Sequence, residues 1–192
     1  MNAKVPLLEH GDNLVVESDL VTKYVAQHVG EGGMYPYDAR DEMDSFLEET
    51  WYPVVDRYYD YLCASSRKGA DAARKKFCVS LRMLNDELFI GRDDSSFEHF
   101  KNGDFFLGEQ FSVVECIAGP WLQRFLVTLP YFRGVDFMTE ILPEECTRLE
   151  KWVRAVTARQ SVMESACSDD EILAAARKYY VSYLSPGAPG VL

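Results

Sequence analysis

The sequence predicts a mostly α-helical protein in which β-structure is limited to a short N-terminal hairpin. From Asp38 onward, apolar residues recur three or four positions apart, which is the spacing of amphipathic helices. Short extended runs bounded by turn residues precede Glu17. The run Gly30-Glu31-Gly32-Gly33 separates these two patterns. We therefore expect a small domain over residues 1–30, a linker over 31–38, a helical domain over 39–184 and a tail over 185–192.

The first domain should consist of a hairpin and one helix. Residues 4–9 are expected to form a strand that begins at Val5-Pro6, residues 10–13 a tight turn, and residues 14–16 the returning strand. Glu17-Ser18 then begins a helix that ends near Val29. A helix N-terminus presents free backbone N–H groups, and serine adds a hydroxyl, so this turn is suited to binding a carboxylate.

The second domain should be a bundle of long helices. The first helix contains Phe46 to Leu62, with Pro53 as a kink, and the second covers residues 70–89. A polar loop follows at 91–103. The remaining helices are expected at 113–129, 143–157 and 169–184.

Ser112 and Glu115 form the strongest local motif of the helical domain. A serine followed three residues later by glutamate, just before an apolar run, is a capping box. The serine hydroxyl accepts from the Glu115 N–H, and the carboxylate reaches back to the Ser112 N–H. Since the following helix is apolar on most sides, we expect it to be the centre of the bundle.

Charge and composition narrow the function classes. The chain has 192 residues and a formal net charge of -11, which disfavours nucleic acid as a partner. The basic run from Arg67 to Lys76 is interpreted as a solvated helix face, and no apolar run is long enough for membrane insertion. The three histidines lack metal-ligand spacing, so no metal is expected. Five scattered cysteines indicate a reducing, intracellular compartment, with the cytoplasm as the simplest setting and an organelle left open.

The run KVPLLEHGDNLVVESDLVTKYVAQHV resembles the third strand, fourth strand and third helix of the thioredoxin-like domain of the glutathione S-transferase family, most closely its omega and lambda classes. The resemblance implies a glutathione site. In it, Lys4 faces the glycyl carboxylate, Val5 at the Val5-Pro6 step pairs its backbone with the cysteinyl unit, and Glu17 and Ser18 hold the γ-glutamyl end. An ordinary hairpin and helix N-cap would account for the same residues.

The run FFLGEQFSVVECIAGPWLQRFLVTLPYFRGVDF is similar to the helical C-terminal domain of the same family, although the family usually has aspartate where this chain has Glu115. The fold class implied is a residual thioredoxin-like β-hairpin plus helix, followed by an all-helical glutathione-transferase C-terminal domain. The first strand-helix-strand unit, which would hold the hydroxyl or thiol that activates glutathione, is absent from this sequence. No catalytic residue is therefore assigned, and Cys116 is interpreted as a packed apolar thiol.

Aromatic residues of the helical domain suggest a second site. By the resemblance, an electrophilic substrate would lie in a hydrophobic pocket between the first and central helices. An aromatic stripe at helical spacing is also typical of ordinary core packing. The residues expected to line the pocket are Trp51, Tyr58, Trp121, Arg124 and Phe125.

Three functions remain open from the sequence. The preferred one is a non-catalytic binding or scaffold module, with a protein partner or a homo-oligomer, as a subunit of a larger assembly. The second is a truncated form of an active omega- or lambda-like glutathione transferase or thiol transferase. The third is a half-site that binds glutathione or an acidic peptide weakly, as a sensor or carrier.

Overall fold

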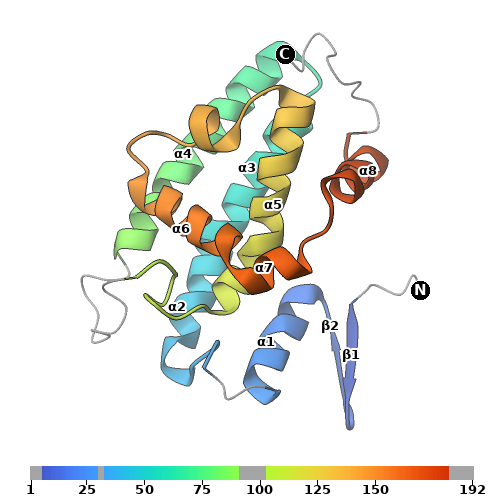
Figure 1. Ribbon diagram of the computed structural model, residues 1–192, viewed down its shortest axis with the longest axis vertical. Coiled ribbons are helices and arrows are strands. Elements are labelled where there is room, and N and C mark those ends of the chain that lie inside the picture. Colours follow the sequence, from blue (N-terminus) through green and yellow to red (C-terminus); the bar gives the residue numbers. More distant parts are fainter. Residues whose placement is uncertain (1–5, 30–32, 91–102, 182–192) are drawn as a thin grey trace.

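The computed structural model describes residues 6–29, 33–90 and 103–181 (Figure 1). Lys4 and Val5, most of the expected loop at 91–103 and the tail lie outside the described residues. Within them, a two-stranded sheet and one helix lie at one end of the molecule, and the helical bundle makes up the rest. This arrangement confirms the predicted fold class.

The hairpin pairs β1 (Leu7–His10) with β2 (Asn13–Val16) in antiparallel register, with Leu7 opposite Val16. The strands extend closer to the turn than expected, which leaves only two residues between them. Gly11 has φ of +59°, a conformation that a residue without Cβ adopts without strain, so a tight turn can close here. Helix α1 (Ser18–His28) follows directly and packs against the central helix.

A single long helical segment begins the bundle. It consists of α2 (Arg40–Ser45), a wider π-helical turn (Phe46–Trp51) and α3 (Tyr52–Leu62), and a short 3₁₀ turn (Tyr37–Ala39) precedes it. Pro53 lies in the first turn of α3. Since proline has no N–H to bond to the preceding turn, the helix widens just before it. The irregularity expected at Pro53 is therefore a π-helical turn.

The central helix is α5 (Val113–Arg133), which ends at Gly134 with φ of +64°. It packs against α3, α6 and α8, and α3 runs along α4 (Arg67–Ile90). Trp51, Tyr58 and Phe125 lie in the core beneath these helices, with the Tyr58 and Phe125 rings 4.5 Å apart. Three further segments complete the bundle: α6 (Thr147–Ala158), α7 (Gln160–Ser165) and α8 (Asp169–Tyr179).

Four predicted helix boundaries are wrong by three or more residues. Helix α4 begins at Arg67 instead of residue 70, and α5 continues to Arg133 instead of ending at residue 129. Helix α6 begins at Thr147 instead of residue 143, because its third residue, Leu149, donates its N–H to the Asn85 side chain of α4 at 3.1 Å. That partner, distant in sequence, fixes where the helix starts. Helix α8 ends at Tyr179 instead of residue 184, and the chain then turns to bury Val181. Helix α7 and the π-helical turn Phe137–Ile141 were not predicted, because segments this short show no helical period.

Candidate functional site

Glu17 occupies the junction between β2 and α1 in a strained backbone conformation. Its φ of 74° and ψ of 131° make it the non-glycine residue with positive φ among those the structure describes. Such a conformation costs about 1–3 kcal/mol and is typical of ligand-binding turns, where the surrounding structure maintains it. Glu17 is also one of the two residues that, by the family resemblance, are expected at the γ-glutamyl end of glutathione.

The structure brings Pro6, Glu17 and Ser18 to the same end of the hairpin. Pro6 and Glu17 lie one position beyond the pair Leu7–Val16, and Ser18 is the first residue of α1. The Ser18 hydroxyl donates to Asp19 Oδ1 at 3.2 Å. Lys4 and Val5, the other two residues assigned to glutathione, are not among the described residues.

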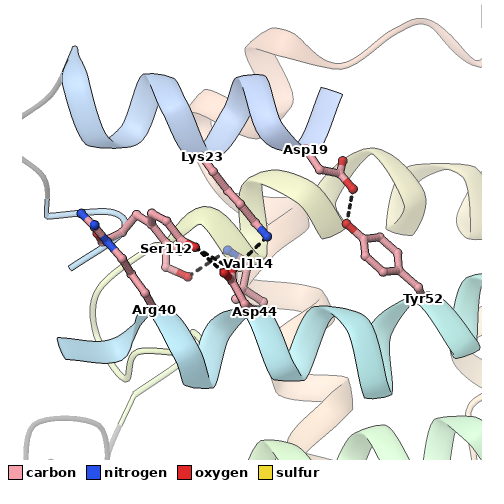
Figure 2. A network of polar contacts seen from close by, with 8 residues as sticks. Asp19, Lys23, Arg40, Asp44, Tyr52, Ser112 and Val114 are labelled. Carbon is pink, nitrogen blue, oxygen red and sulfur yellow. Dashed lines mark hydrogen bonds and ion pairs between the residues drawn. The ribbon is translucent and has the colours of Figure 1, made fainter. Parts of the chain in front are cut away.

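Polar contacts fix α1 on the helical bundle (Figure 2). The Lys23 ammonium lies 2.8 Å from Asp44 Oδ1, and the Tyr35 hydroxyl donates to the same carboxylate at 2.7 Å. One turn before Lys23, the Tyr52 hydroxyl of α3 donates to Asp19 Oδ2. Asp19 follows Glu17-Ser18 directly, so this bond determines how the candidate site is oriented relative to the bundle.

These contacts perturb the tyrosines involved. Burial raises the pKa of Tyr52 above its ordinary value, and the hydrogen bond to the Asp19 carboxylate raises it further. The pKa of Tyr35 is raised in the same way, first by burial and then by Asp44. Both hydroxyls stay protonated at neutral pH and act as donors. This network could not be predicted from the sequence, because the spacing of Asp19 and Lys23 on α1 does not identify their partners on α2 and α3.

The aromatic residues expected to line a pocket separate into two environments. Trp51 and Phe125 are fully buried in the core, and Trp121 packs edge-on against Tyr59. Tyr58 and Arg124 line a cavity of about 270 Å³ between α3, α5 and α8. The Arg124 guanidinium lies 4.4 Å from the centroid of the Trp121 ring. Helix α8 lines the third side of the cavity with Ile172 and Ala176, and Tyr180, the residue after the helix, also lines it.

The predicted capping box at Ser112 and Glu115 is present, and Glu115 makes more hydrogen bonds than a capping box needs. Ser112 Oγ accepts from the Val114 N–H at 3.2 Å, and Glu115 Oε2 accepts from the Ser112 N–H at 2.9 Å. Both residues are fully buried. Their role is to anchor the start of α5, beside the end of α1.

Three of the five cysteines are poorly suited to nucleophilic catalysis. Burial raises the pKa of Cys116 to about 11, and the neighbouring Glu115 charge adds to that shift. Burial likewise raises the pKa of Cys146 to about 11 and raises that of Cys78. Among the described residues, no group of three or more His, Cys, Asp or Glu side chains is arranged to hold a metal ion. No helix in the described part of the chain is both long and apolar enough to cross a membrane.

Comparison with known families identifies the helical part. The family model "Glutathione S-transferase, C-terminal domain" matches residues 80–155, which run from the middle of α4 through most of α6. The helical part of this chain is thus similar to the C-terminal domain of glutathione S-transferases. The hairpin and α1 at its N-terminal end agree with the expected thioredoxin-like remnant.

The sequence similarity to known proteins extends beyond that domain. Glutathione S-transferase U1 of Arabidopsis thaliana is 24% identical over 162 residues, which cover 84% of this chain and 66% of the relative. The stringent starvation protein A homolog of Pasteurella multocida is 27% identical over 138 residues, covering 69% of this chain and 55% of the relative. The chain thus spans about two thirds of the first relative and about half of the second.

Solved structures confirm the fold. Glutathione transferase Omega 3C from Trametes versicolor superimposes with a TM-score of 0.66 at 18% identity, over 93% of this chain and 72% of that protein. The tau-class glutathione S-transferase of mango, Mangifera indica, gives a TM-score of 0.62 at 24% identity, over 91% and 76%. The likeness to the omega class agrees with the prediction from sequence, and the lambda class stays a prediction.

Proposed function

We propose that this protein is a glutathione S-transferase-like binding module that holds the γ-glutamyl end of glutathione at the Glu17-Ser18 turn without catalysing transfer of its sulfur. The observation that carries the proposal is the strained backbone of Glu17, held at φ of 74° where β2 meets α1. The turn places a side-chain carboxylate for the ligand's ammonium, and it places a hydroxyl and helix N-terminal N–H groups for the ligand's carboxylate. These groups complement an α-amino acid.

The proposed lack of catalysis is supported by the properties of three of the five cysteines. A nucleophilic cysteine needs a lowered pKa, because the thiolate is the reactive form. Cys78, Cys116 and Cys146 instead have raised pKa values, so their thiolates are scarce at neutral pH. A role in binding, as a module within a larger assembly, is consistent with these properties.

A second function is favoured by a different observation. A groove of about 890 Å³ lies between α1 and the start of α5, lined by apolar side chains that include Val25, Val29 and Phe111. Val29 is 68% exposed and Leu14 on the hairpin is 60% exposed. An additional segment of chain would cover such surfaces. The alternative is therefore an active omega-like glutathione transferase or thiol transferase in which a preceding segment supplies the catalytic group and the Tyr58–Arg124 cavity receives the electrophile.

Calorimetric titration with glutathione tests the binding proposal. We expect saturable binding by the full chain and at least tenfold weaker binding after Ser18→Ala, because a carboxylate would lose a hydrogen bond worth about 1.5–3 kcal/mol. Ser165→Ala, at an exposed serine near the end of α7, is the matched control and should bind as the parent does. Equal binding by parent and Ser18→Ala would place the ligand elsewhere, and no binding would reject the proposal.

Measurements of enzymatic turnover and of intact mass distinguish the two proposed functions. We expect no conjugation to an electrophilic aromatic substrate and no reduction of a mixed disulfide above the uncatalysed rate. The intact mass of the native protein is compared with the 21.9 kDa of this chain. A native mass greater by about 50 residues, the size of a strand-helix-strand unit, together with measurable turnover would establish the alternative.

A further inference from the structure

A groove of about 380 Å³ lies between α4 and the α2–α3 segment, which pack side by side (Figure 1). Its α4 side is one stripe at helical spacing, formed by Ser80, Met83 and Glu87. The opposite side is formed around the π-helical turn Phe46–Trp51. Because π-helical turns are frequent at functional sites, this groove is a candidate for binding.

The floor of the groove is apolar. Phe46 and Phe106 are buried there, and the centroids of their rings lie 4.6 Å apart. Met83 is 61% exposed and, together with Pro53, extends the apolar lining to the surface. Aromatic rings offer a large apolar surface, and the flexible methionine side chain can adjust to the shape of a ligand. The floor is therefore suited to covering by an apolar part of a partner.

Three carboxylates surround this floor. Glu42, Glu49 and Glu87 line the groove, and none of them makes an ion pair with any residue that the structure describes. None of the described residues that line the groove is a lysine, arginine or histidine. Burial raises the pKa of Glu42, so a positive charge placed here would stabilise its ionised form. The groove thus combines an apolar floor with negative charge that no described residue neutralises.

The negative charge extends over the α2–α3 segment. Residues 38–60 contain eight Asp and Glu side chains and two arginines. Arg57 forms an ion pair with Asp60, and the Arg40 guanidinium lies over the Tyr35 ring, so both arginines are engaged outside the groove. The surroundings of the groove on this segment therefore reinforce its negative potential.

The cations of α4 lie outside the groove as well. Arg82 is 2.5 Å from the Glu145 carboxylate and is therefore engaged by the segment that precedes α6. Lys76 precedes Ser80 by one turn on the same stripe, but it does not line the groove and makes no ion pair with the three carboxylates. The positive charge that would complement the groove has to come from a partner.

We infer that this groove docks a basic segment of a partner protein, in which lysine or arginine side chains alternate with apolar ones. Long cationic side chains have apolar stems and a charged end, so they can cover the floor at Phe46 and Met83 while their charges reach the carboxylates around it. Apolar side chains of the segment fill the remaining floor. Complementary charge then fixes the register and favours basic partners over others.

A basic protein segment fits this groove better than a second copy or a small polyamine. The net charge of -11 opposes the approach of a second copy and attracts a basic chain. A polyamine carries the charge but has no large apolar side chain to cover the floor. The groove is formed by α2, α3 and α4, whereas the Glu17-Ser18 turn lies at the start of α1, so this inference and the glutathione proposal can fail independently.

Fluorescence anisotropy with two labelled peptides of equal charge tests the inference. One peptide alternates lysine with leucine, and the other alternates lysine with serine. At about 50 mM salt, where surface charges are weakly screened, we expect the full chain to bind the leucine peptide saturably. The serine peptide should bind about fivefold more weakly or worse, because it cannot cover the apolar floor. Spermine, which has charge alone, should displace the leucine peptide only at much higher concentration.

Variants of matched charge locate the binding. The test variant neutralises the three carboxylates of the groove, as Glu42→Gln/Glu49→Gln/Glu87→Gln. The control neutralises three exposed carboxylates elsewhere, as Glu9→Gln/Asp12→Asn/Glu144→Gln. We expect the test variant to bind the leucine peptide about tenfold more weakly or worse, and the control to bind it as the parent does. Both should bind glutathione as the parent does, which separates this result from the test of the Glu17-Ser18 site.

A second pair of variants examines the floor. Met83→Ala should reduce the preference for the leucine peptide over the serine peptide, whereas Met163→Ala, at a methionine 57% exposed on α7, should leave it unchanged. Circular dichroism should be the same for all variants, since none of the substituted side chains is fully buried.

Four results would overturn the inference. The first is that neither peptide binds, and the second is that the test and control variants bind the leucine peptide equally, which would mean that net charge alone attracts it. The third is that the two peptides, or the leucine peptide and spermine, bind with the same affinity. The fourth is a dimer in sedimentation that the leucine peptide dissociates, because a second copy would then be the occupant of the groove.

Discussion

The indole Nε1–H of Trp152 donates a hydrogen bond to Oε1 of Glu115 at 2.8 Å, joining α6 to the first turn of α5 in the centre of the molecule. The same oxygen accepts from the Phe106 N–H at 2.6 Å, and Oε2 accepts from both the N–H and the hydroxyl of Ser112. Glu115 is fully buried, so each of these bonds is shielded from water. A capping residue thus connects three segments of the bundle.

Glu115→Gln should destabilise the protein by about 3 kcal/mol. The substitution keeps the shape but replaces one acceptor oxygen with an NH₂ group that faces buried donors, which costs their desolvation without compensation. Chemical denaturation followed by tryptophan fluorescence measures the change. Ser168 and Glu171 form the same motif at the exposed start of α8, and Glu171→Gln there should have a much smaller effect. Equal losses at the two sites would show that the burial of Glu115 contributes nothing.

Glu17→Gly should be more stable than Glu17→Ala by about 1 kcal/mol, because glycine adopts the positive φ of this position without strain. Both variants lose the carboxylate and should bind glutathione equally weakly. Thermal unfolding and calorimetric titration measure the two effects separately. In β1, Glu9→Gly at an ordinary strand position should instead destabilise the protein. If Glu17→Gly proves less stable than Glu17→Ala, the strained conformation is not the one adopted in solution.

Tyr52→Phe and Asp19→Ala should show coupled effects. Their hydrogen bond holds the first turn of α1 on α3, so the double variant should lose less stability than the two single variants together, by about 1 kcal/mol. Hydrogen exchange in α1 should accelerate in Tyr52→Phe, since the helix has lost a tether to the bundle. Tyr37→Phe, at a tyrosine 85% exposed, serves as the control. Additive losses would mean that the two groups do not interact in solution.

Stability should fall as pH rises above about 10. The pKa values of Tyr35, Tyr52 and Tyr58 are raised, in each case mainly by burial, above the ordinary value of 10.0. Above pH 10 the unfolded chain therefore loses phenolic protons that the folded chain retains. The unfolded state then binds fewer protons, the slope of the unfolding free energy against pH is negative, and the contribution is complete only below pH 10.

Denaturation midpoints between pH 8 and pH 11 measure this slope. Tyr52→Phe should reduce it, whereas Tyr37→Phe should leave it unchanged, because Tyr37 is exposed. A flat profile up to pH 11 would show that the buried tyrosines ionise as easily in the folded chain as in the unfolded one.

Much of the fold could be predicted from local sequence patterns. The hairpin, the start of α1 at Ser18 and the start of α5 at Val113 depend on neighbouring residues, so their signals lie within a few positions of one another. The start of α6 could not be predicted, because Asn85, more than sixty positions away, accepts the hydrogen bond from Leu149. Likewise, the helical spacing of apolar residues predicted that Trp51 and Tyr58 face inward. It could not show that Trp51 packs in the core whereas Tyr58 also lines a cavity.

The sequence by itself indicated the resemblance to glutathione S-transferases, the order of the long helices and the turns at Glu17-Ser18 and Ser112–Glu115, because these motifs follow from local backbone preferences and short-range hydrogen bonds. Only the tertiary structure showed that Glu115 meets Trp152, that Tyr52 holds Asp19 beside the candidate site, and that burial raises the pKa of Cys116. Hydrogen-bond partners and solvent exclusion arise when distant segments pack together, and that packing is not encoded in the spacing of any one segment.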